Sequence, residues 1–311
     1  MLQMQSSLEK SKNATFKLYE NYENSPFEKN LNERATLANI EKSIIKKFRK
    51  PIWGKFVKAM KDFEMVQEGD RICVCISGGK DSMLLAKCLQ ELQKHGTVNF
   101  ELEFLVTDPG YDKVNLGRVI DNAKLLGLDI NMFETHIFEI VSKVENGPCY
   151  LCARMRRGHL YAGGQKLGCN KIALGHHQDD VIETIMLNLC YGSEVKTMMP
   201  KLHSTNFEGM ELIRPLYYVE EKDIIAWKNY NGLNFINCAC PLNDTCDLDE
   251  GEAPKIGKRR EMKNLLNTIN EINPDIKQNI FRSLENVNME AIVGYRTGKE
   301  RHSFMDNYDR D

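Results

Sequence analysis

Short apolar runs alternate with longer amphipathic stretches through the middle of this 311-residue chain. The runs have the length of buried strands and lie at 71–77, 100–107, 129–135 and 171–174. Between and after them, apolar residues recur every three to four positions, which predicts helices at 81–94, 113–126, 154–167 and 179–189. Strands that alternate with helices of this length form βαβ units, so we predict an α/β fold with a doubly wound parallel sheet. Ligands of such a sheet bind at the carboxyl ends of its strands.

Helical patterns flank this region on both sides. On the N-terminal side, Ile40, Ile44 and Phe48 follow a helical period within 37–63, and Pro51 is expected to break or bend that helix because it lacks an N–H donor. After about residue 219 the pattern is mostly helical, with segments at 220–231, 254–271 and 274–287. We therefore expect a polar N-terminal extension (1–36), a basic helical segment (37–66), an α/β domain (67–218), a C-terminal helical region (219–296) and a flexible tail (297–311).

The formal net charge of −2 excludes a chain that is basic throughout, so any surface for a polyanion is local. One segment is a candidate, because it holds eight basic residues and no acidic one: Lys42, Lys46, Lys47, Arg49, Lys50, Lys55, Lys58 and Lys61. A solvated helix face is the plain alternative, but the excess favours a surface that faces a polyanion. The chain shows no secretory leader and no apolar run of about 18 residues, which predicts a cytoplasmic protein without a membrane span.

A glycine-rich turn follows the first expected strand and opens the first helix, with the residues Ser77, Gly78, Gly79, Lys80, Asp81 and Ser82. Its glycines allow a tight turn, and the free N–H groups at a helix start point toward an anion such as a phosphate. The serines and the lysine add donors and a charge, whereas an acid beside a phosphate calls for a magnesium ion between them. The turn is neither a Walker loop nor a dinucleotide fingerprint, because the residues that define those motifs are missing.

A second polar cluster ends the strand at 171–174, in the order Gly175, His176, His177, Gln178, Asp179, Asp180. Because the carboxyl ends of parallel strands share one edge of the sheet, we expect these imidazoles and carboxylates to lie near the glycine-rich turn. The plain alternatives are that Asp179 only caps the following helix and that His177 is only a packed ring.

Ten cysteines in a chain without an export signal point to metal or redox chemistry rather than to disulfides. Three of them lie within apolar patterns and are expected to pack in the core: Cys73, Cys75 and Cys88. Cys149 and Cys152, in the expected loop before a helix, have the C-x-x-C spacing with which a single turn binds one metal centre. Further thiolates are available from the late cluster, Cys238, Cys240 and Cys246.

Three arginines, Arg154, Arg156 and Arg157, directly follow the C-x-x-C pair. Arginine grips phosphate oxygens with two parallel N–H donors, so these residues predict contact with phosphates of a nucleotide or of an RNA backbone. Ordinary surface arginines are the plain alternative. For the cysteines the alternatives are a free structural pair, a thioredoxin-like redox pair and a closed four-thiolate zinc site.

The string SGGKDS resembles the PP-loop of enzymes that cleave ATP between the α- and β-phosphates and adenylate their substrates. Longer strings are similar, in order, to those of the tRNA 2-thiocytidine synthetases, which thiolate cytidine 32 of the anticodon loop. These strings are EGDRICVCISGGKDS, CYLCARMRRGHLY, KIALGHHQDDVIETIMLNLCYG, MPKLHS and IRPLYYVEEKDI, followed by the late cysteines. The likeness covers about 46–241, well over half of the chain.

The resemblance implies a set of site residues and cofactors. ATP is implied on the six residues of the turn, Ser77 to Ser82, with Gly175 and His176. Catalytic roles in holding Mg²⁺ or activating the base are implied for Asp81, Asp179 and Asp180. A [4Fe-4S] cluster is implied on Cys149, Cys152 and Cys240, or Cys238 in its place, because this chain reads N-C-A-C-P where the family reads P-C-x-x-C-G. The candidates for the tRNA backbone are Lys46, Lys47, Arg49, Lys50, Arg156 and Arg157.

The reaction implied by the resemblance is ATP-dependent formation of 2-thiocytidine in tRNA. The C2 oxygen of the base attacks the α-phosphate, and sulfide carried by the cluster then displaces AMP. The implied partners are tRNA, a sulfide or persulfide donor such as a cysteine desulfurase, and a second copy of the chain. The alternatives are thiolation of a uridine or another tRNA position, amide-type ligation, which needs no C-x-x-C pair, and a zinc-stabilised nucleotide-binding protein.

Overall fold

The structure is a computed structural model that describes residues 16–17, 36–144, 148–236 and 257–308. The chain divides into two compact units, the first formed by Met1–Val181 with Met199–Gly257 and the second by Ile182–Met198 with Lys258–Asp311. The expected C-terminal region 219–296 is therefore split. Its first helix belongs to the first unit because it packs on the helix that follows the glycine-rich turn, with the Trp227 side chain fully buried.

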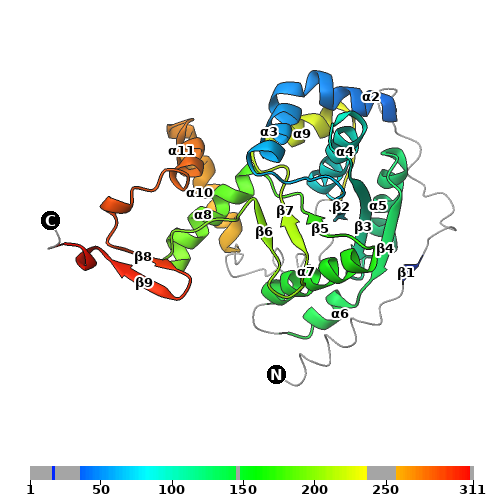
Figure 1. Cartoon of the computed structure of the whole chain (residues 1–311). Coiled ribbons are helices and arrows are strands. Elements are labelled where there is room, and N and C mark those ends of the chain that lie inside the picture. Colours follow the sequence, from blue (N-terminus) through cyan, green and yellow to red (C-terminus); the bar gives the residue numbers. More distant parts are fainter. Residues whose placement is uncertain (1–15, 18–35, 145–147, 237–256, 309–311) are drawn as a thin grey trace, which may run out of the picture. The chain divides into compact units, whose positions relative to one another are not determined.

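A seven-stranded sheet forms the centre of the first unit, in the order β1-β4-β3-β2-β5-β7-β6 (Figure 1). The five central strands are parallel, and the edge strands β1 and β6 are antiparallel to their neighbours. The strands are β1 (Phe16–Lys17), β2 (Arg71–Ile76), β3 (Glu101–Asp108), β4 (Ile130–Glu134), β5 (Lys171–Ala173), β6 (Lys201–His203) and β7 (Glu211–Ile213). The predicted α/β fold and its parallel sheet are confirmed. The pattern does not predict β6 and β7, because three residues are too few to show a period.

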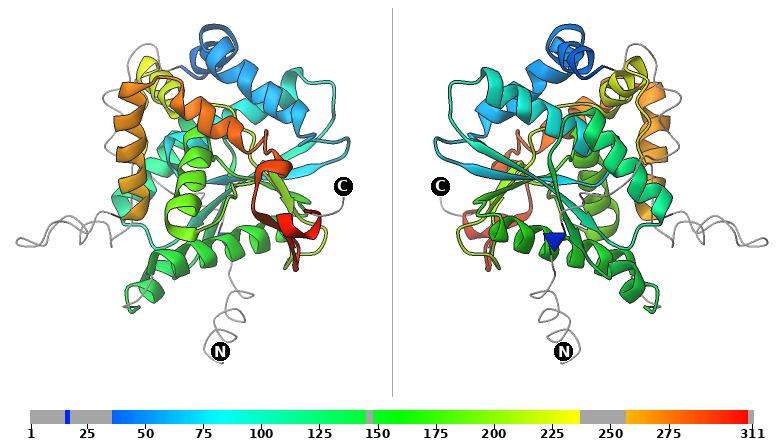
Figure 2. Two further views of the ribbon diagram at one scale, coloured as in Figure 1. Left: turned by 90° about the vertical axis from the view of Figure 1, so that its left-hand side faces the viewer. Right: turned by 90° about the vertical axis from the view of Figure 1, so that its right-hand side faces the viewer.

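Helices cover both faces of this sheet (Figures 1 and 2). The chain passes outward from β2 through α4 and α5 to β4, then returns past β2 through α7 to β5. With right-handed crossovers, this order puts α4 and α5 on one face and α7 on the other. The helices that follow β2 are α4 (Lys80–His95), α5 (Lys113–Leu125), α6 (Ile137–Val141), α7 (Pro148–Lys166), α8 (Gln178–Gly192) and α9 (Glu221–Tyr230).

Helix α7 begins earlier than the apolar period predicts, at Pro148 instead of residue 154. Proline is favoured in the first turn of a helix because the N–H that it lacks would have no partner there. The C-x-x-C pair therefore lies in the first turn of α7 and not in a loop before it. Gly163 and Gly164 let α7 approach the sheet, since a Cβ on them would lie 2.6 Å from Leu105 and 3.2 Å from Ile172.

The basic segment is helical almost without interruption, through α2 (Leu37–Lys42), η2 (Ser43–Lys47), η3 (Arg49–Trp53) and α3 (Gly54–Asp62). Pro51, which was expected to break or bend this helix, does not break it. The chain passes this proline in π-helical turns, η2 and η3, which is one of the ways in which a helix absorbs an irregularity. The apolar face is fully buried at Ile40, Ile44 and Ile52, so this segment is part of the core of the first unit.

A buried ion pair ties α2 to α4. The Lys87 Nζ lies 2.7 Å from Glu41 Oε1 and donates a hydrogen bond of 2.9 Å to the Leu126 carbonyl. Burial lowers the pKa of Lys87, and the hydrogen bond and charge of Glu41 offset part of that effect. Breaking a buried pair by removal of one partner is strongly destabilising, so Glu41 is a necessary counter-ion.

The second unit contains α8 from Ile182 onward, α10 (Lys258–Ile272) and α11 (Ile276–Ser283). Arg259 Nε lies 2.8 Å from Glu183 Oε2 within it. The chain then forms a hairpin of β8 (Gly294–Thr297) and β9 (Glu300–Ser303), followed by the 3-10 turn η5 (Phe304–Asp306). The expected flexible tail 297–311 thus contains regular structure, which its polar sequence does not signal. Among the described residues, no helix is both long and apolar enough to span a membrane.

Candidate active site

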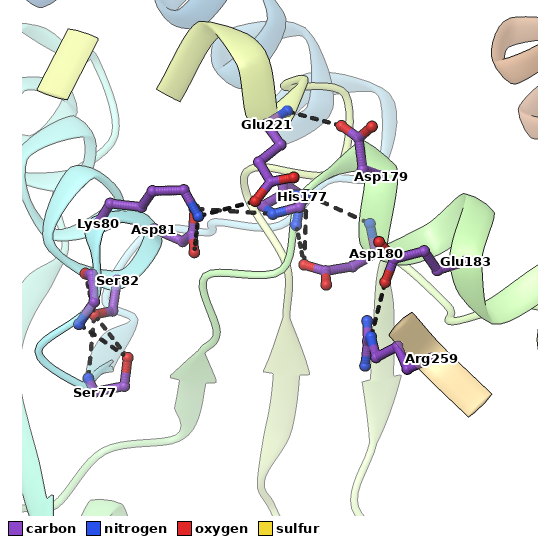
Figure 3. A network of polar contacts seen from close by, with 11 residues as sticks. Ser77, Lys80, Asp81, Ser82, His177, Asp179, Asp180, Glu183, Glu221 and Arg259 are labelled. Atoms are coloured by element: carbon purple, nitrogen blue, oxygen red, sulfur yellow. Dashed lines mark hydrogen bonds and ion pairs between the residues drawn. The ribbon is translucent and has the colours of Figure 1, made fainter. Parts of the chain in front are cut away.

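Polar residues from three neighbouring strands meet at the carboxyl edge of the sheet. Ser77 follows β2, Gly175 and His176 follow β5, and Arg214 follows β7. Figure 3 shows the glycine-rich turn and the start of α8 side by side at this edge. The predicted proximity of the two motifs is confirmed.

The glycine-rich turn is closed by its own serines. Ser82 Oγ accepts a 3.1 Å hydrogen bond from the Ser77 N–H and donates one of 3.0 Å to the Gly79 carbonyl. Gly78 has a φ of +80°, and a Cβ on it would lie 2.6 Å from Val119 and 2.7 Å from Ile236. Only glycine fits both this conformation and this space.

Lys80 is held between two carboxylates. Its Nζ lies 3.2 Å from Asp81 Oδ2 and 3.2 Å from Glu221 Oε1 (Figure 3). Glu221 is the first residue of α9. Burial alone lowers the pKa of Lys80, but the two carboxylates outweigh it and raise this pKa above its usual value. Lys80 is therefore a firmly charged cation at the edge where an anion would bind.

Asp81 and Asp180 flank the buried ring of His177. The His177 Nε2 lies 3.8 Å from Asp81 Oδ1, and its Nδ1 lies 3.5 Å from Asp180 Oδ2. The Asp81 Oδ1 atom is buried and accepts no hydrogen bond from the described residues. Burial raises the pKa of Asp81, and the charges of His177 and Lys80 offset only part of this effect. His177 is thus a packed ring, as the plain alternative held, but one placed between two site carboxylates.

Asp179 joins the start of α8 to the start of α9. Its Oδ2 accepts a 2.8 Å hydrogen bond from the Glu221 N–H, so the carboxylate lies at the positive end of the neighbouring helix (Figure 3). Glu221 in turn contacts Lys80. A sequence pattern cannot show this contact, because the two residues are far apart in the chain and the acid carries no motif of its own.

Gly175 lets the start of α8 touch the first turn of α4. A Cβ on Gly175 would lie 3.0 Å from the Asp81 carbonyl carbon and 3.0 Å from the Ser82 nitrogen. Both are backbone atoms, which cannot rotate away as a flexible side chain can.

We expect Gly175→Ala to displace the turn and to weaken ATP binding by at least about 10-fold, with a loss of about 1–3 kcal/mol in stability from overpacking. Calorimetric titration with ATP and thermal unfolding measure the two effects. Gly117→Ala, on α5, is the matched control. Beyond its chain neighbours and the helix backbone around it, a Cβ added at Gly117 would have no described atom within 4 Å, and alanine favours a helix. Equal ATP affinities for both variants would contradict the proposed role of this contact.

Arg214 is a site residue that the sequence reasoning missed. It is 8% exposed, and its Nε donates a 3.3 Å hydrogen bond to His176 Nδ1. Burial, and next the charge of Arg157, lower its pKa to about 10. The available signal was an arginine directly after an apolar pair in the string IRPLYY, but β7 is too short for the pattern to predict a strand end there.

A comparison with protein families bears on this arrangement. The model described as the PP-loop domain matches residues 53–240. The chain belongs to the PP-loop family. The relatives include two proteins named tRNA-cytidine(32) 2-sulfurtransferase. The one from Pelobacter propionicus is 38% identical over 76% of this chain and 85% of its own length. The one from Vibrio cholerae is 40% identical over 78% of this chain and 75% of its own.

A solved structure supports the PP-loop fold. It is the U34-tRNA thiolase NcsA from Methanococcus maripaludis with its [4Fe-4S] cluster, matched with a TM-score of 0.58 over 77% of this chain and 80% of that one. The sequences are 21% identical, so this likeness concerns the fold.

The cysteines of this PP-loop protein fall into two groups. Cys73, Cys75 and Cys88 are buried, as predicted for core residues, and Cys169 is buried with them. Cys152, by contrast, is half-buried on α7, one turn after Cys149, whose side chain is not described. The late candidates Cys238, Cys240 and Cys246 lie outside the described residues.

Two contacts lead from the PP-loop toward both cysteine regions. The Tyr111 hydroxyl donates a 3.2 Å hydrogen bond to the Ser77 carbonyl, and Tyr111 and Cys152 pack on the same apolar cluster around Phe138. On the other side, the Ile236 N–H donates a 3.3 Å hydrogen bond to the Gly78 carbonyl. The described segment 148–236 therefore ends at the PP-loop, two residues before Cys238.

Most of the predicted RNA-binding cations form no ion pair with a residue that the structure describes. Among the described residues, no carboxylate lies within ion-pair distance of the basic segment's Lys42, Lys46, Arg49, Lys50 and Lys61 or of Arg154, Arg156 and Arg157 on α7. Lys47 lies 4.1 Å from the centre of the Tyr230 ring. Lys55 and Lys58 are different, since Lys55 pairs with Glu220 and Asp223 and Lys58 pairs with Asp62.

Proposed function

We propose that this PP-loop protein catalyses ATP-dependent thiolation of a tRNA cytidine at C2, with AMP and pyrophosphate as the other products. The observation that carries the proposal is that two residues contact the PP-loop: Tyr111, which packs on the same apolar cluster as Cys152, and Ile236, which ends the described segment before the late cysteines. We assign the sulfur chemistry to the thiols of these two parts of the chain. The relatives named tRNA-cytidine(32) 2-sulfurtransferase support the choice of base.

ATP binds at the carboxyl edge in this proposal. The N–H groups at the start of α4 and the Lys80 ammonium receive the β- and γ-phosphates, and Gly175 and His176 line the same edge. The buried Asp81 Oδ1, without a hydrogen bond from the described residues, fits a Mg²⁺ ligand. Magnesium held there would neutralise phosphate charge.

The chemistry consists of two displacements, the first at the α-phosphorus of ATP and the second at C2 of the base. The C2 oxygen attacks the α-phosphorus, the bond to the β-phosphate breaks, and pyrophosphate leaves. A sulfur nucleophile then attacks C2 and AMP departs with the former oxygen. We assign to Asp180, next to His177, the role of accepting a proton or orienting the base. Asp179 positions the start of α9 and thereby Glu221, which contacts Lys80.

Three thiols would hold a [4Fe-4S] cluster in this proposal. Two of them, Cys149 and Cys152, have the C-x-x-C spacing and belong to α7. The third ligand is Cys240 or Cys238. Such a cluster, with one iron free of protein ligands, would supply the sulfur nucleophile for the second displacement.

In this proposal the tRNA backbone contacts the exposed Lys46, Lys47, Arg49 and Lys50 of the basic segment and, on α7, the exposed Arg157 and the half-buried Arg156. Cations without carboxylate partners are free to replace counterions of RNA. A cysteine desulfurase or another sulfide donor reloads the sulfur. The protein acts in the cytoplasm, where tRNA is found, and as a homodimer.

Nucleoside analysis tests this function. Reconstituted protein is incubated anaerobically with tRNA lacking thionucleosides, ATP, Mg²⁺ and sulfide, and the digested tRNA is examined by mass spectrometry. We expect 2-thiocytidine, with one AMP formed per sulfur incorporated, and none without ATP. A 2-thiouridine product would move the function to the uridine alternative. ATP cleavage with no sulfur in the RNA would exclude thiolation.

A further inference from the structure

Three cationic side chains are buried in the described part of the chain: Lys87, Lys171 and Arg214. Two of them are neutralised inside the protein. Lys87 lies 2.7 Å from Glu41, and Lys171 lies 2.8 Å from Asp70 and 3.2 Å from Glu211. Arg214 differs, because no carboxylate of the described residues lies within ion-pair distance of it.

The hydrogen bonds of Arg214 go to a ring nitrogen and a backbone carbonyl, not to a carboxylate. Its Nε donates to His176 Nδ1 at 3.3 Å, and its Nη1 donates to the Met199 carbonyl. These bonds orient the guanidinium at the end of β7 without cancelling its charge.

A second guanidinium acts on the charge of Arg214. Arg157 of α7 is exposed, and its charge opposes protonation of Arg214, whereas the charge of Asp180 favours it. Two cations that repel each other, one of them buried, cost stability in the ligand-free protein. A protein keeps such a pair where an anion binds between or beside the two groups.

We propose that Arg214, with His176 and Arg157, forms a second phosphoryl-binding subsite, separate from the PP-loop and built at the end of β7. This proposal rests on the proposed function for its ligand, a phosphoryl oxygen that comes either from the RNA backbone beside the target base or from the α-phosphate of ATP. The subsite lies two strands from the PP-loop in the order β2-β5-β7, roughly 10 Å away at normal strand spacing. Arg214 is in this view a binding residue, and His176 is the acceptor that orients its guanidinium.

Replacing Arg214 tests the subsite through two measurements that should change in opposite directions: the thermal midpoint of the ligand-free protein and the affinity for the phosphoryl ligand. We expect Arg214→Met to keep or raise the thermal midpoint of the ligand-free protein, since a buried charge is removed. The same variant should bind its phosphoryl ligand about 10–100-fold more weakly, the range for loss of a charged hydrogen bond. Arg214→Lys, which keeps the charge without the planar fork, should lose less affinity than Arg214→Met.

Two binding measurements distinguish the source of the phosphoryl group. Fluorescence anisotropy with labelled tRNA reports the RNA arm, and calorimetry with α,β-methylene ATP reports the nucleotide arm. Weaker tRNA binding alone assigns the subsite to the RNA backbone, and weaker nucleotide binding alone assigns it to the α-phosphate. The comparison variant is Lys171→Met, which should lower the thermal midpoint because it strands Asp70 and Glu211.

Other results overturn the subsite. If Arg214→Met lowers the midpoint as Lys171→Met does and binds both ligands normally, Arg214 is a structural cation. If the wild type binds both ligands and Arg214→Met binds them with the same affinity, the subsite is excluded and the proposed function still stands. A wild type that binds neither tRNA nor the ATP analogue removes both.

Discussion

The Cys149→Ala variant is expected to contain no stoichiometric iron or acid-labile sulfide and to transfer no sulfur to tRNA, while it binds ATP as the wild type does. Cys149 and Cys152 share the first turn of α7, so loss of one thiolate leaves a single ligand there. Loss of a group that merely supports a metal ligand lowers metal affinity or activity about 10–100-fold, and loss of the ligand itself should lower them further. Iron and sulfide analysis after anaerobic reconstitution, with a visible spectrum, measures the outcome.

The control for Cys149→Ala is Cys190→Ala, because Cys190 is an exposed thiol on α8 in the second unit. It should retain about four irons and four sulfides, as expected of a [4Fe-4S] protein. Cys238→Ala and Cys240→Ala are compared in the same assay, and the one that loses the cluster names the third ligand. Zinc with no acid-labile sulfide in the wild type would contradict the sulfur-carrier chemistry and favour a closed zinc site.

The Asp81→Asn variant is expected to lose about 10³-fold in the rate of ATP-dependent thiolation, as for other groups that manage phosphate charge. Its ligand-free form should nevertheless unfold at a higher temperature than the wild type at pH 7. The folded-state pKa of Asp81 is raised above its usual value of 3.8, so its ionised form costs stability at neutral pH. That cost disappears as the pH falls toward the unfolded-state value, and the two proteins should converge there.

Calorimetric unfolding between pH 4 and pH 8 in the absence of nucleotide and magnesium checks this sign. Asp121→Asn is the control, since Asp121 is a half-buried carboxylate in the second half of α5 and is not one of the site residues described above. Neither the activity nor the stability of this variant should change appreciably. A lower midpoint for Asp81→Asn at neutral pH would show that Asp81 stabilises the turn instead of serving a ligand.

The sequence predicts the fold well where the apolar period is long. Strands β2 to β5 and helices α4, α5 and α8 lie close to their predicted bounds, because each buries a full face against neighbours. The pattern fails where an element is short or irregular. β6 and β7 have three residues each, the helix runs through Pro51 in π-helical turns, and the polar hairpin of β8 and β9 lies in a stretch that reads as a tail.

The candidate site divides in the same way. The PP-loop and the Gly175–Asp180 cluster are local strings, so their meeting follows from parallel strands alone. The contacts of Glu221 with Lys80 and of Arg214 with His176 join residues 141 and 38 positions apart in the chain. All four residues stand in strings quoted above, but a string does not show which residue contacts which, and only the folded backbone brings each pair together. The roles proposed for the cysteines and the RNA-binding cations still rest on sequence and on the neighbourhood of the PP-loop.

The ion pair between Glu41 and Lys87 shows that the folded core of the first unit begins earlier in the chain than the match to the family model. The family match begins at residue 53, yet Glu41 and the fully buried Ile40, Ile44 and Ile52 all precede it. A polypeptide cut at the start of the match would expose the apolar face on which α2, η2 and η3 pack and leave an ammonium group buried without its carboxylate. A piece of this chain that keeps this core must therefore include the residues from Leu37 onward, and the basic residues proposed to meet tRNA are among them.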